Sequence, residues 1–415
     1  MRIGIDVRAT QFVHGARGLG AYVYTMLDGL LAEAPGHEYV LVTLPDLPLP
    51  PRLAAHAEAG RCRVVHLPTR LLFGDSGLGR LPRLWRLYYR RGEREHHAAL
   101  AALARRERLD VLHVAVPFDG AMFAGVGGRL RGHGRVVTTA YDLIPLVFEA
   151  VHFPPGSARQ RLVYDRQLRG YRDADAVVAI SASARDDFVR LGGLDPARVR
   201  VVPYAVGGHF APLEQPDAAR ALLAALGVRP PYFLFCSGAG FNKNRPRVVE
   251  AFGRFLADRP AGDRGFQLVF AGPERELDVE TLKAVAFDGG LSREQFVMTG
   301  FVPEATLVAL FGLAVALVTP SLYEGLGLPA AQAMRTGTPV IASDRASHPE
   351  LVGDAGLLVD PYDVGAIAGA MTRLAGDEAL RRSLAERGMA RARPFTPAAQ
   401  ARALLAVYED RPPPA

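Results

Sequence analysis

Cysteine and long apolar runs are scarce in this chain, and each scarcity narrows the class of protein. Only two of the 415 residues are cysteines, Cys62 and Cys236, which offer neither a disulfide framework nor the ligand spacing of a metal site. No run of about 18 apolar residues occurs, so no membrane-spanning helix is predicted. The first residues read as a strand and not as a secretory signal. We therefore expect a cytoplasmic protein without a resident metal.

Lysine is also rare, and arginine carries most of the positive charge. The formal net charge is +6 and the isoelectric point is about 9.5. This excess suits an anionic ligand or an anionic surface, and it leaves phosphates, lipid headgroups and nucleic acid open. No nucleic-acid-binding motif accompanies the charge, so nucleic acid is not expected as a partner.

Length and hydropathy patterning predict two α/β domains. A chain of 415 residues is too long for one compact core. Short β-branched runs alternate with helical stretches, which is typical of parallel sheets covered by helices on both faces. A Pro/Gly segment, Val202–Gly208, is predicted to be a hinge between domains 1–205 and 206–394.

The predicted strands form two sets, each large enough for one doubly wound sheet. The first set lies at residues 2–5, 39–43, 63–66, 111–114, 136–139, 176–180 and 199–202. The second set lies at residues 232–236, 267–271, 296–299, 315–319, 340–342 and 356–359.

The most specific stretch is a glycine-rich turn, Pro320–Pro329, between a predicted buried strand and a helix that begins near Gly327. Glycines let the backbone approach a ligand, and free amides at a helix start favour an anion. A phosphate would repel Glu324, so this carboxylate fits better as an acceptor for sugar hydroxyls or as a counter-charge to an oxocarbenium ion. The alternative is an ordinary strand-to-helix turn with an exposed acid.

The segment Tyr323–Met334, followed by Gly337–Ser343, resembles the signature of glycosyltransferase family 4. The resemblance extends from the first strand to about Arg393. It implies the GT-B fold, an α/β architecture of two Rossmann-like doubly wound domains facing across a cleft. It also implies that a C-terminal helix at about residues 395–410 packs back on the first domain.

The resemblance assigns roles to several residues of the second half. Glu324 would contact the donor sugar, and Lys243 would neutralise the donor diphosphate. Gln332 stands where the family has a second glutamate that binds the ribose, and an amide can still hydrogen-bond a diol. Further donor-binding positions, contributed largely by the backbone, are Gly238, Phe301, Val302, Gly325, Leu326 and Gly327. Gly238 aligns with a basic residue that is usual in the family, and Arg245 and Arg247 lie nearby in sequence.

The first half carries weaker signals. By resemblance, the loop Gly15–Tyr22 faces the donor phosphates through Gly18 and Gly20, and Arg17 is a candidate replacement for the missing basic residue. On the acceptor side, Tyr141 stands where histidine is common. Asp142 either orients an acceptor hydroxyl or caps a turn.

Three further features have mainly structural explanations. Ser181 or Ser183 is predicted to cap a helix. Asp173-Ala174-Asp175 precedes a buried strand, so we interpret it as a structural turn. The segment Arg80–Arg94 is either a surface helix whose apolar face joins the core or an interfacial helix attracted to anionic lipid.

The resemblance implies a retaining, metal-independent transferase with no cofactor besides the donor. Glu324, Lys243 and Asp142 are its candidate catalytic residues. A hexose would move from a UDP- or GDP-sugar to a hydroxyl of a glycan, a lipid-linked sugar or a small molecule. The expected location is the cytoplasm, including the inner face of the membrane. The alternatives are a nucleotide-sugar epimerase or phosphorylase of the same fold, and a non-catalytic sugar- or partner-binding protein.

Overall fold

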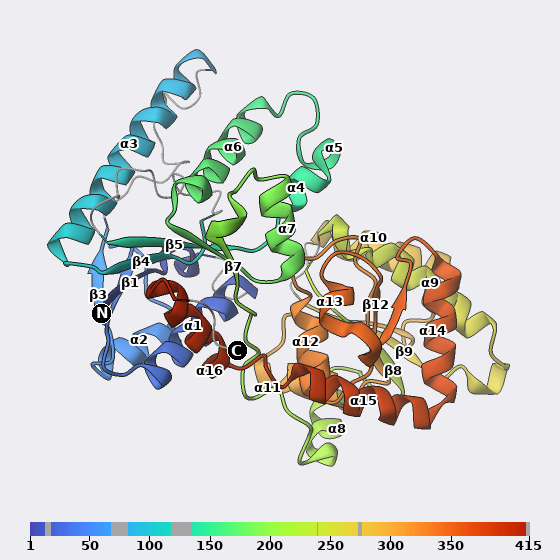
Figure 1. Cartoon of the computed structure of the whole chain (residues 1–415). Coiled ribbons are helices and arrows are strands. Elements are labelled where there is room, and N and C mark those ends of the chain that lie inside the picture. The colour runs from blue at the N-terminus through green and yellow to red at the C-terminus, as the bar shows by residue number, and fades with distance from the viewer. Residues whose placement is uncertain (13–17, 68–81, 118–133, 239, 273–275, 412–415) are drawn as a thin grey trace. The chain divides into compact units, whose positions relative to one another are not determined.

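The structure is a computed structural model that describes residues 1–12, 18–67, 82–117, 134–238, 240–272 and 276–411. The chain divides into two compact units (Figure 1). The first unit contains Met1–Ala205 together with Pro397–Ala415, and the second contains Val206–Thr396. Each unit is built around one parallel sheet.

The sheet of the first unit has seven strands in the order β3-β2-β1-β4-β5-β6-β7. These strands are β1 (Arg2–Asp6), β2 (Glu38–Thr43), β3 (Arg63–His66), β4 (Val111–Val114), β5 (Arg135–Ala140), β6 (Ala176–Ala179) and β7 (Val199–Val201). The helices are α1 (Gly18–Glu33), α2 (Pro51–Glu58), α3 (Pro82–Arg106), α4 (Ile144–Val147), α5 (Glu149–His152), α6 (Ala158–Asp173), α7 (Ala182–Arg190) and α16 (Pro397–Tyr408). Every residue of β4 and β6 is buried, as expected for strands covered on both faces.

The sheet of the second unit has six strands in the order β10-β9-β8-β11-β12-β13. These strands are β8 (Tyr232–Cys236), β9 (Gln267–Ala271), β10 (Phe296–Gly300), β11 (Ala316–Thr319), β12 (Val340–Ser343) and β13 (Leu357–Val359). The helices are α8 (Pro216–Ala224), α9 (Arg245–Ala257), α10 (Glu276–Asp288), α11 (Glu304–Gly312), α12 (Leu328–Arg335), α13 (His348–Val352), α14 (Val364–Gly376) and α15 (Glu378–Ala392).

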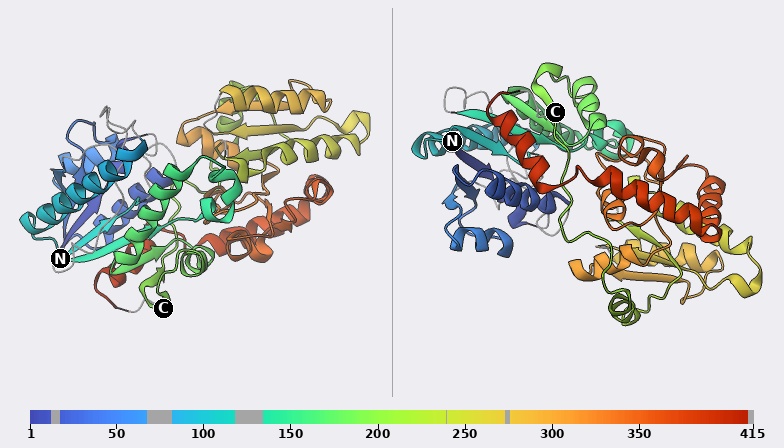
Figure 2. Two further views of the ribbon diagram at one scale, coloured as in Figure 1. Left: turned by 90° about the horizontal axis from the view of Figure 1, so that it is seen from above. Right: turned by 60° about the horizontal axis from the view of Figure 1, so that its bottom comes forward.

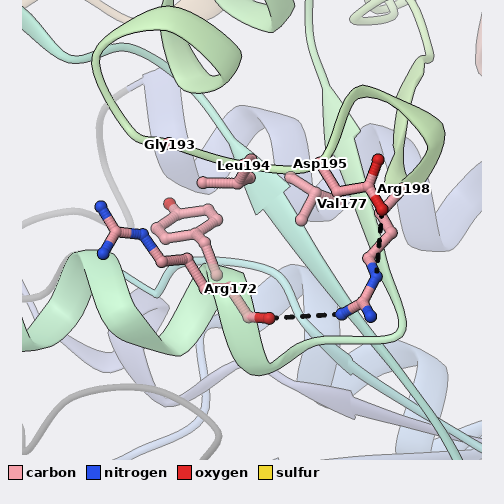
Figure 3. Close-up of a pocket in the computed structure, with 7 residues that line it drawn as sticks. Arg172, Val177, Gly193, Leu194, Asp195 and Arg198 are labelled. Atoms are coloured by element: carbon pink, nitrogen blue, oxygen red, sulfur yellow. Dashed lines mark hydrogen bonds and ion pairs between the residues drawn. The ribbon is translucent and has the colours of Figure 1, made fainter.

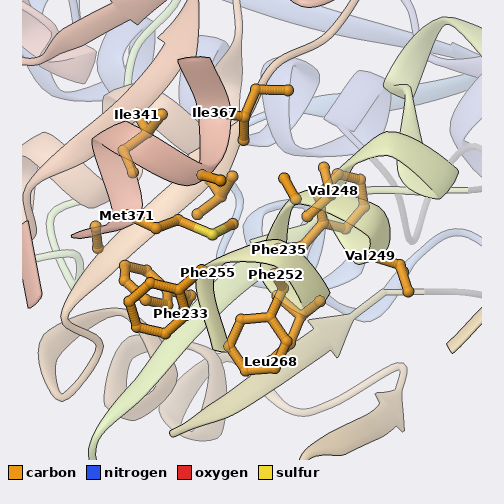
Figure 4. Close-up of a cluster of buried hydrophobic side chains, with 14 of the residues drawn as sticks. Phe233, Phe235, Val248, Val249, Phe252, Phe255, Leu268, Ile341, Ile367 and Met371 are labelled. Atoms are coloured by element: carbon orange, nitrogen blue, oxygen red, sulfur yellow. The ribbon is translucent and has the colours of Figure 1, made fainter. Parts of the chain in front are cut away.

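Two hydrophobic cores hold the second sheet, one on each face. Alternate residues of β8 point to opposite faces, so Phe233 joins one core and Tyr232 joins the other. The first core contains a group of phenylalanines from β8 and α9 (Figure 4). Phe233 and Phe255 meet edge to face with their ring centroids 5.3 Å apart, an arrangement that aromatic pairs favour. The sheet is therefore fixed from both sides, which gives the loops at its edge a rigid base.

Helix α16 belongs to the first unit although it ends the chain (Figure 2). It packs on α1, where a Cβ atom added to Gly29 would lie 2.2 Å from the main-chain oxygen of Pro397. The hydroxyl of Tyr408 lies 2.6 Å from Nδ1 of His113 on β4. Burial lowers the pKa of His113 to about 3, so this contact joins two uncharged groups.

The strand predictions are confirmed, because every predicted strand is present with ends that differ by no more than two residues. The capping prediction is confirmed for Ser181, whose Oγ accepts a hydrogen bond from the amide of Ala184 (2.9 Å). The structural interpretation of Asp173–Asp175 is also confirmed, because Oδ2 of Asp175 accepts a hydrogen bond from the amide of Val136 (2.8 Å). Cys62 and Cys236 are both free thiols.

Candidate functional site

The strand order of the second sheet places its candidate site between β8 and β11. Strands β9 and β10 extend the sheet on one side of β8, whereas β11 to β13 extend it on the other. In open α/β sheets, ligands bind at such a reversal, outside the carboxyl ends of the strands. Lys243 lies in the short 3-10 helix that follows β8, and Glu324 lies in the turn that follows β11.

Lys243 and Glu324 form an ion pair across this reversal. Nζ of Lys243 donates to both carboxylate oxygens of Glu324, at 2.7 and 2.9 Å. Oε1 of Glu324 also accepts a hydrogen bond from Oγ of Ser321 (2.8 Å). The side chains of Lys243 and Glu324 are 22% and 12% exposed, so the pair is sheltered but reachable. The sequence predicted both residues as parts of one site, and the structure brings them together.

The carboxyl group of Glu324 is ionised. Burial alone would raise its pKa, because it disfavours the charged form. The charge of Lys243, with the hydrogen bonds from Lys243 and Ser321, outweighs that effect and holds the pKa of Glu324 below its ordinary value. The site therefore presents a fixed negative charge directly beside an ammonium group.

Two buried asparagines fasten the segment around Lys243 to the neighbouring loops. Nδ2 of Asn242 donates to the main-chain oxygen of Tyr323 (2.9 Å). Asn244 has a φ of +60°, which asparagine tolerates better than most residues, and it precedes the first residue of α9. Its Nδ2 donates to the main-chain oxygens of Pro320 (3.0 Å) and Pro361 (2.6 Å). These bonds fix the spacing between the two charged residues.

The glycine turn after β11 opens α12 as the sequence predicted. Gly327 precedes the first helical residue with φ +93° and ψ +51°, a conformation that favours glycine. The amide of Ala330 already donates to the main-chain oxygen of Gly327 (2.9 Å), so a phosphate here would meet the amides of the turn itself. Gln332 lies half-buried in α12, one turn after Leu328. The proposed contacts of Gly325, Leu326 and Gln332 with a donor stay predictions.

The other predicted donor-binding positions of the second unit follow strands β8 and β10 at the same edge of the sheet. Gly238 follows β8, and open space surrounds the position where its Cβ atom would lie. Phe301 follows β10 and is 65% exposed, while Val302 packs against a hydrophobic core. The amide of Gly272 donates to the main-chain oxygen of Gly300 (2.9 Å), which joins the ends of β9 and β10.

Three polar residues near the ion pair were missed by the sequence analysis. Ser321 donates to the carboxylate of Glu324, and Oγ of Ser347 donates to its main-chain oxygen (3.0 Å). His348 is fully buried close to both charges. The sequence could have indicated them, because they follow predicted strands at the edge of the sheet where ligands bind.

The predicted acceptor-side residues lie in the first unit. Tyr141 donates its hydroxyl proton to the main-chain oxygen of Ala115 (2.8 Å), so this proton is already engaged. Oδ1 of Asp142 accepts a hydrogen bond from the amide of Ile144 (3.1 Å), which is the turn-capping role of the two that were predicted. Gly18 and Gly20 lie in the first turn of α1. Arg17 falls outside the described residues.

A cavity of about 180 Å³ in the first unit is separate from these groups (Figure 3). It lies near the amino ends of β6 and β7, the edge opposite the one where such sheets bind ligands. Its charged groups bond to neighbouring protein atoms. Arg172 donates to the main-chain oxygen of Gly192 (2.8 Å), and Arg198 donates to that of Arg172 (3.4 Å). The cavity therefore carries no functional assignment.

The basic segment Arg80–Arg94 forms part of α3 from Pro82 onward. Arg90 and Arg94 are exposed, whereas Arg80 and the side chains of residues 82–88 lie outside what the structure describes. Contact of this segment with a membrane stays a prediction. Within the described ranges, no helix is long and apolar enough to span a bilayer, and no three metal-ligating side chains of His, Cys, Asp or Glu gather in one place.

Family comparisons cover both units. The model of a glycosyl transferase 4-like domain matches residues 17–205, and that of glycosyl transferases group 1 matches residues 224–391. The chain belongs to the group 1/family 4 glycosyltransferases. The second match includes the Lys243–Glu324 pair and the turn that opens α12.

Relatives of the chain within this family differ in length and in named substrate. The serotype-specific mannosyltransferase WbdA of Escherichia coli is 26% identical over 95% of this chain, which spans 46% of that protein. The chain thus covers less than half of this relative. The 2-deoxystreptamine N-acetyl-D-glucosaminyltransferase of Streptomyces fradiae is 32% identical over 67% of this chain and 65% of its own length.

Solved structures confirm the predicted GT-B fold. The crystal structure of Anabaena HepE in complex with UDP and glucose superposes with a TM-score of 0.69, covering 99% of this chain and all of that one at 16% identity. Sucrose-phosphate synthase of Thermosynechococcus elongatus superposes with a TM-score of 0.72, covering 99% of this chain and 98% of that one at 21% identity. At such identities the likeness concerns the fold alone.

Proposed function

We propose that this protein transfers a hexose from a UDP- or GDP-sugar to a hydroxyl group, with retention of anomeric configuration and without a metal ion. The observation that carries the proposal is the Lys243–Glu324 ion pair beside the glycine turn at the start of α12. An ammonium and helix-start amides suit a diphosphate, while a carboxylate suits sugar hydroxyls. The acceptor is the hydroxyl of a glycan, a lipid-linked sugar or a small molecule.

In the proposed reaction, the bond between the anomeric carbon and the diphosphate breaks while a bond to the acceptor oxygen forms on the same face. The acceptor proton passes to an oxygen of the leaving diphosphate. Lys243 and the amides of the turn stabilise the charge that develops on the leaving group. Glu324 holds the sugar and faces the positive charge on its anomeric carbon. This scheme assigns no covalent intermediate to the protein.

Three findings support the proposal. The chain belongs to a glycosyltransferase family, and relatives named above are mannosyl- and N-acetylglucosaminyltransferases. HepE, which shares the fold, binds UDP and glucose in its crystal structure. In this chain, the ion pair lies where the fold places ligands.

A binding screen tests the donor site. Isothermal titration with UDP, GDP, UDP-glucose and GDP-mannose, each with EDTA, is run on the wild type, Lys243→Ala and Glu324→Ala. We expect binding either of UDP and UDP-glucose or of GDP and GDP-mannose, and we expect EDTA to leave this binding unchanged. Lys243→Ala should weaken binding of both the sugar conjugate and the bare diphosphate about tenfold or more, because a charge-assisted contact is lost. Glu324→Ala should mainly reduce the extra affinity that the sugar contributes.

The chain offers a matched control in Lys283. This residue lies on α10, where Nζ is 3.1 Å from Glu280 in an exposed pair. Lys283→Ala should leave every affinity unchanged, because surface pairs of this kind contribute little. Equal losses in Lys243→Ala and Lys283→Ala, or no binding of any nucleotide sugar, would refute the donor-site assignment. Retention is then checked from the anomeric proton coupling of the first product.

A further inference from the structure

His348 is a fully buried imidazole with one nitrogen engaged. Its Nδ1 lies 2.8 Å from Oγ of Ser343, at the end of β12. Its Nε2 is buried and has no hydrogen-bond partner among the residues that the structure describes. A buried polar atom without a partner is unfavourable, so such an atom near a ligand site is a candidate for an interaction that forms only in another state.

The unpartnered nitrogen faces the glycine turn. A Cβ atom added to Gly327 would lie 2.7 Å from both Cδ2 and Nε2 of His348. The imidazole edge therefore occupies the space that the missing side chain of Gly327 leaves open. The turn that we assign to the donor diphosphate and the unpartnered nitrogen are thus in direct contact.

The chain beside His348 is also attached to Glu324. Oγ of the preceding residue, Ser347, donates to the main-chain oxygen of Glu324 (3.0 Å). The carboxylate itself takes two hydrogen bonds from Lys243 and one from Ser321. Under the proposed function, a bound diphosphate draws the ammonium of Lys243 toward its own oxygens. The sheltered carboxylate would then lose its cation, which is strongly unfavourable unless another donor replaces it.

We propose that His348 is a positioning residue that donates a hydrogen bond from Nε2 to the carboxylate of Glu324 when a nucleotide sugar engages Lys243. This inference rests on the proposed function. It requires the tautomer with the proton on Nε2, in which the hydroxyl of Ser343 donates to Nδ1. The exchange would hold Glu324 in place for the sugar hydroxyls without a further positive charge.

An uncharged imidazole suits this role. Burial lowers the pKa of His348 to about 4; the charge of Glu324 opposes this effect and that of Lys243 adds to it. At neutral pH the ring therefore donates without adding a cation that would compete with Lys243 for the diphosphate. A hydrogen bond from a neutral group also leaves the negative charge of Glu324 available to the sugar.

Three substitutions separate the two ring nitrogens. The amide nitrogen of glutamine reaches about as far as Nε2, so His348→Gln keeps the proposed donor and loses the bond to Ser343. His348→Asn does the reverse, because its amide reaches only as far as Nδ1. His348→Leu keeps much of the volume and removes both nitrogens. Thermal unfolding without ligand reports any effect on stability for each variant.

The measured quantity is the affinity that the sugar contributes to binding. It is expressed as the ratio of the Kd for UDP to the Kd for UDP-glucose, or of the Kd for GDP to the Kd for GDP-mannose. We expect this ratio to fall about tenfold in His348→Asn and His348→Leu and to stay within about threefold of the wild type in His348→Gln. Binding of the bare diphosphate should change little in all three. If the role of His348 were purely structural, the decrease in the Kd ratio would correlate with the loss of thermal stability. It would not depend on which ring nitrogen the new side chain replaces.

Two outcomes would overturn the inference while leaving the proposed function in place. One is a ratio of the two Kd values that falls as far in His348→Gln as it does in His348→Asn. The other, independent of any variant, is a nitrogen-15 spectrum of the histidine-labelled wild type in which Nε2 of His348 carries no proton in the presence of the bound nucleotide sugar. A wild type that binds no nucleotide sugar would refute the proposed function itself, and the inference with it.

Discussion

At the scale of single residues, Gly327 is a position where the site tolerates little change. Its φ of +93° is unfavourable for a residue with a side chain, and an added Cβ atom would meet His348 at 2.7 Å. We expect Gly327→Ala to lower the free energy of unfolding by about 1–3 kcal/mol. It should also weaken binding of the donor, because the turn must shift. Urea unfolding and donor titration measure the two effects.

Gly369 provides the control for this change. It lies within α14, is exposed, and has nothing within 4 Å of the position of an added Cβ atom. Gly369→Ala should stabilise the protein by up to about 1 kcal/mol, because alanine is the better helix former. Similar effects of the two substitutions would contradict the role given to the backbone of Gly327.

At the scale of elements, the packing of α16 on α1 includes one very close approach of two backbones. Gly29 faces Pro397 so closely that an added Cβ atom would lie 2.2 Å from a main-chain oxygen. We expect Gly29→Ala to destabilise the first unit by about 1–3 kcal/mol and to loosen α16. Thermal unfolding and limited proteolysis near residue 397 follow both effects.

Gly36 serves as the comparison for Gly29. It lies in the turn after α1, and an added Cβ atom would have nothing within 4 Å. Gly36→Ala should leave both the melting temperature and the proteolysis pattern close to those of the wild type. If Gly29→Ala behaves in the same way, α16 is held by its other contacts, such as Arg402 with Glu33 at 2.7 Å.

The strands were predictable because parallel strands covered on both faces must be apolar at nearly every position. The runs Val111–Val114 and Tyr232–Cys236 satisfy this condition, and their predicted bounds match the structure. The order of the strands was not predictable in this way. Strand β11 pairs with β8 although two strands and three α-helices separate them in the chain.

That difference explains which parts of the site were found from sequence. The glycines, the carboxylate and the start of the helix are adjacent in the sequence around Glu324, so the sequence alone predicted a ligand site there. The 2.7 Å contact with Lys243 joins residues 81 positions apart and depends on the strand order. His348 was missed for the same reason, because the contact of its buried Nε2 with the turn is visible only in the folded structure.

At the scale of the whole molecule, the two units have separate sheets, and the Lys243–Glu324 pair of the proposed donor site lies in the second. Units with their own cores can unfold as separate cooperative transitions. We expect calorimetry to resolve two transitions. A nucleotide sugar at about 100 times its Kd should raise one of them by roughly 5–10 °C, since such an excess contributes about 2.7 kcal/mol.

The Lys243→Ala variant identifies the transition that responds. Without ligand, its two transitions should resemble those of the wild type. With the same concentration of ligand, the midpoint temperature of each transition should rise by only a fraction of the wild-type shift. A single transition in the wild type would show that the units unfold as one body, and equal shifts of two transitions would show that the ligand does not act on the second unit alone.

Lys243 and Lys283 are the only lysines in a chain with 49 basic residues other than histidine. One lies in the sheltered ion pair of the candidate site, and the other lies on α10 with its side chain 42% exposed. An amine-selective acylating reagent thus meets two side-chain amines in very different surroundings. The exposed amine provides an internal standard, and under the proposed function a bound nucleotide sugar should shield the other amine from the reagent. The ratio of the two acylated peptides then reports how far the site is filled, even in a mixture where no acceptor is known and no product forms.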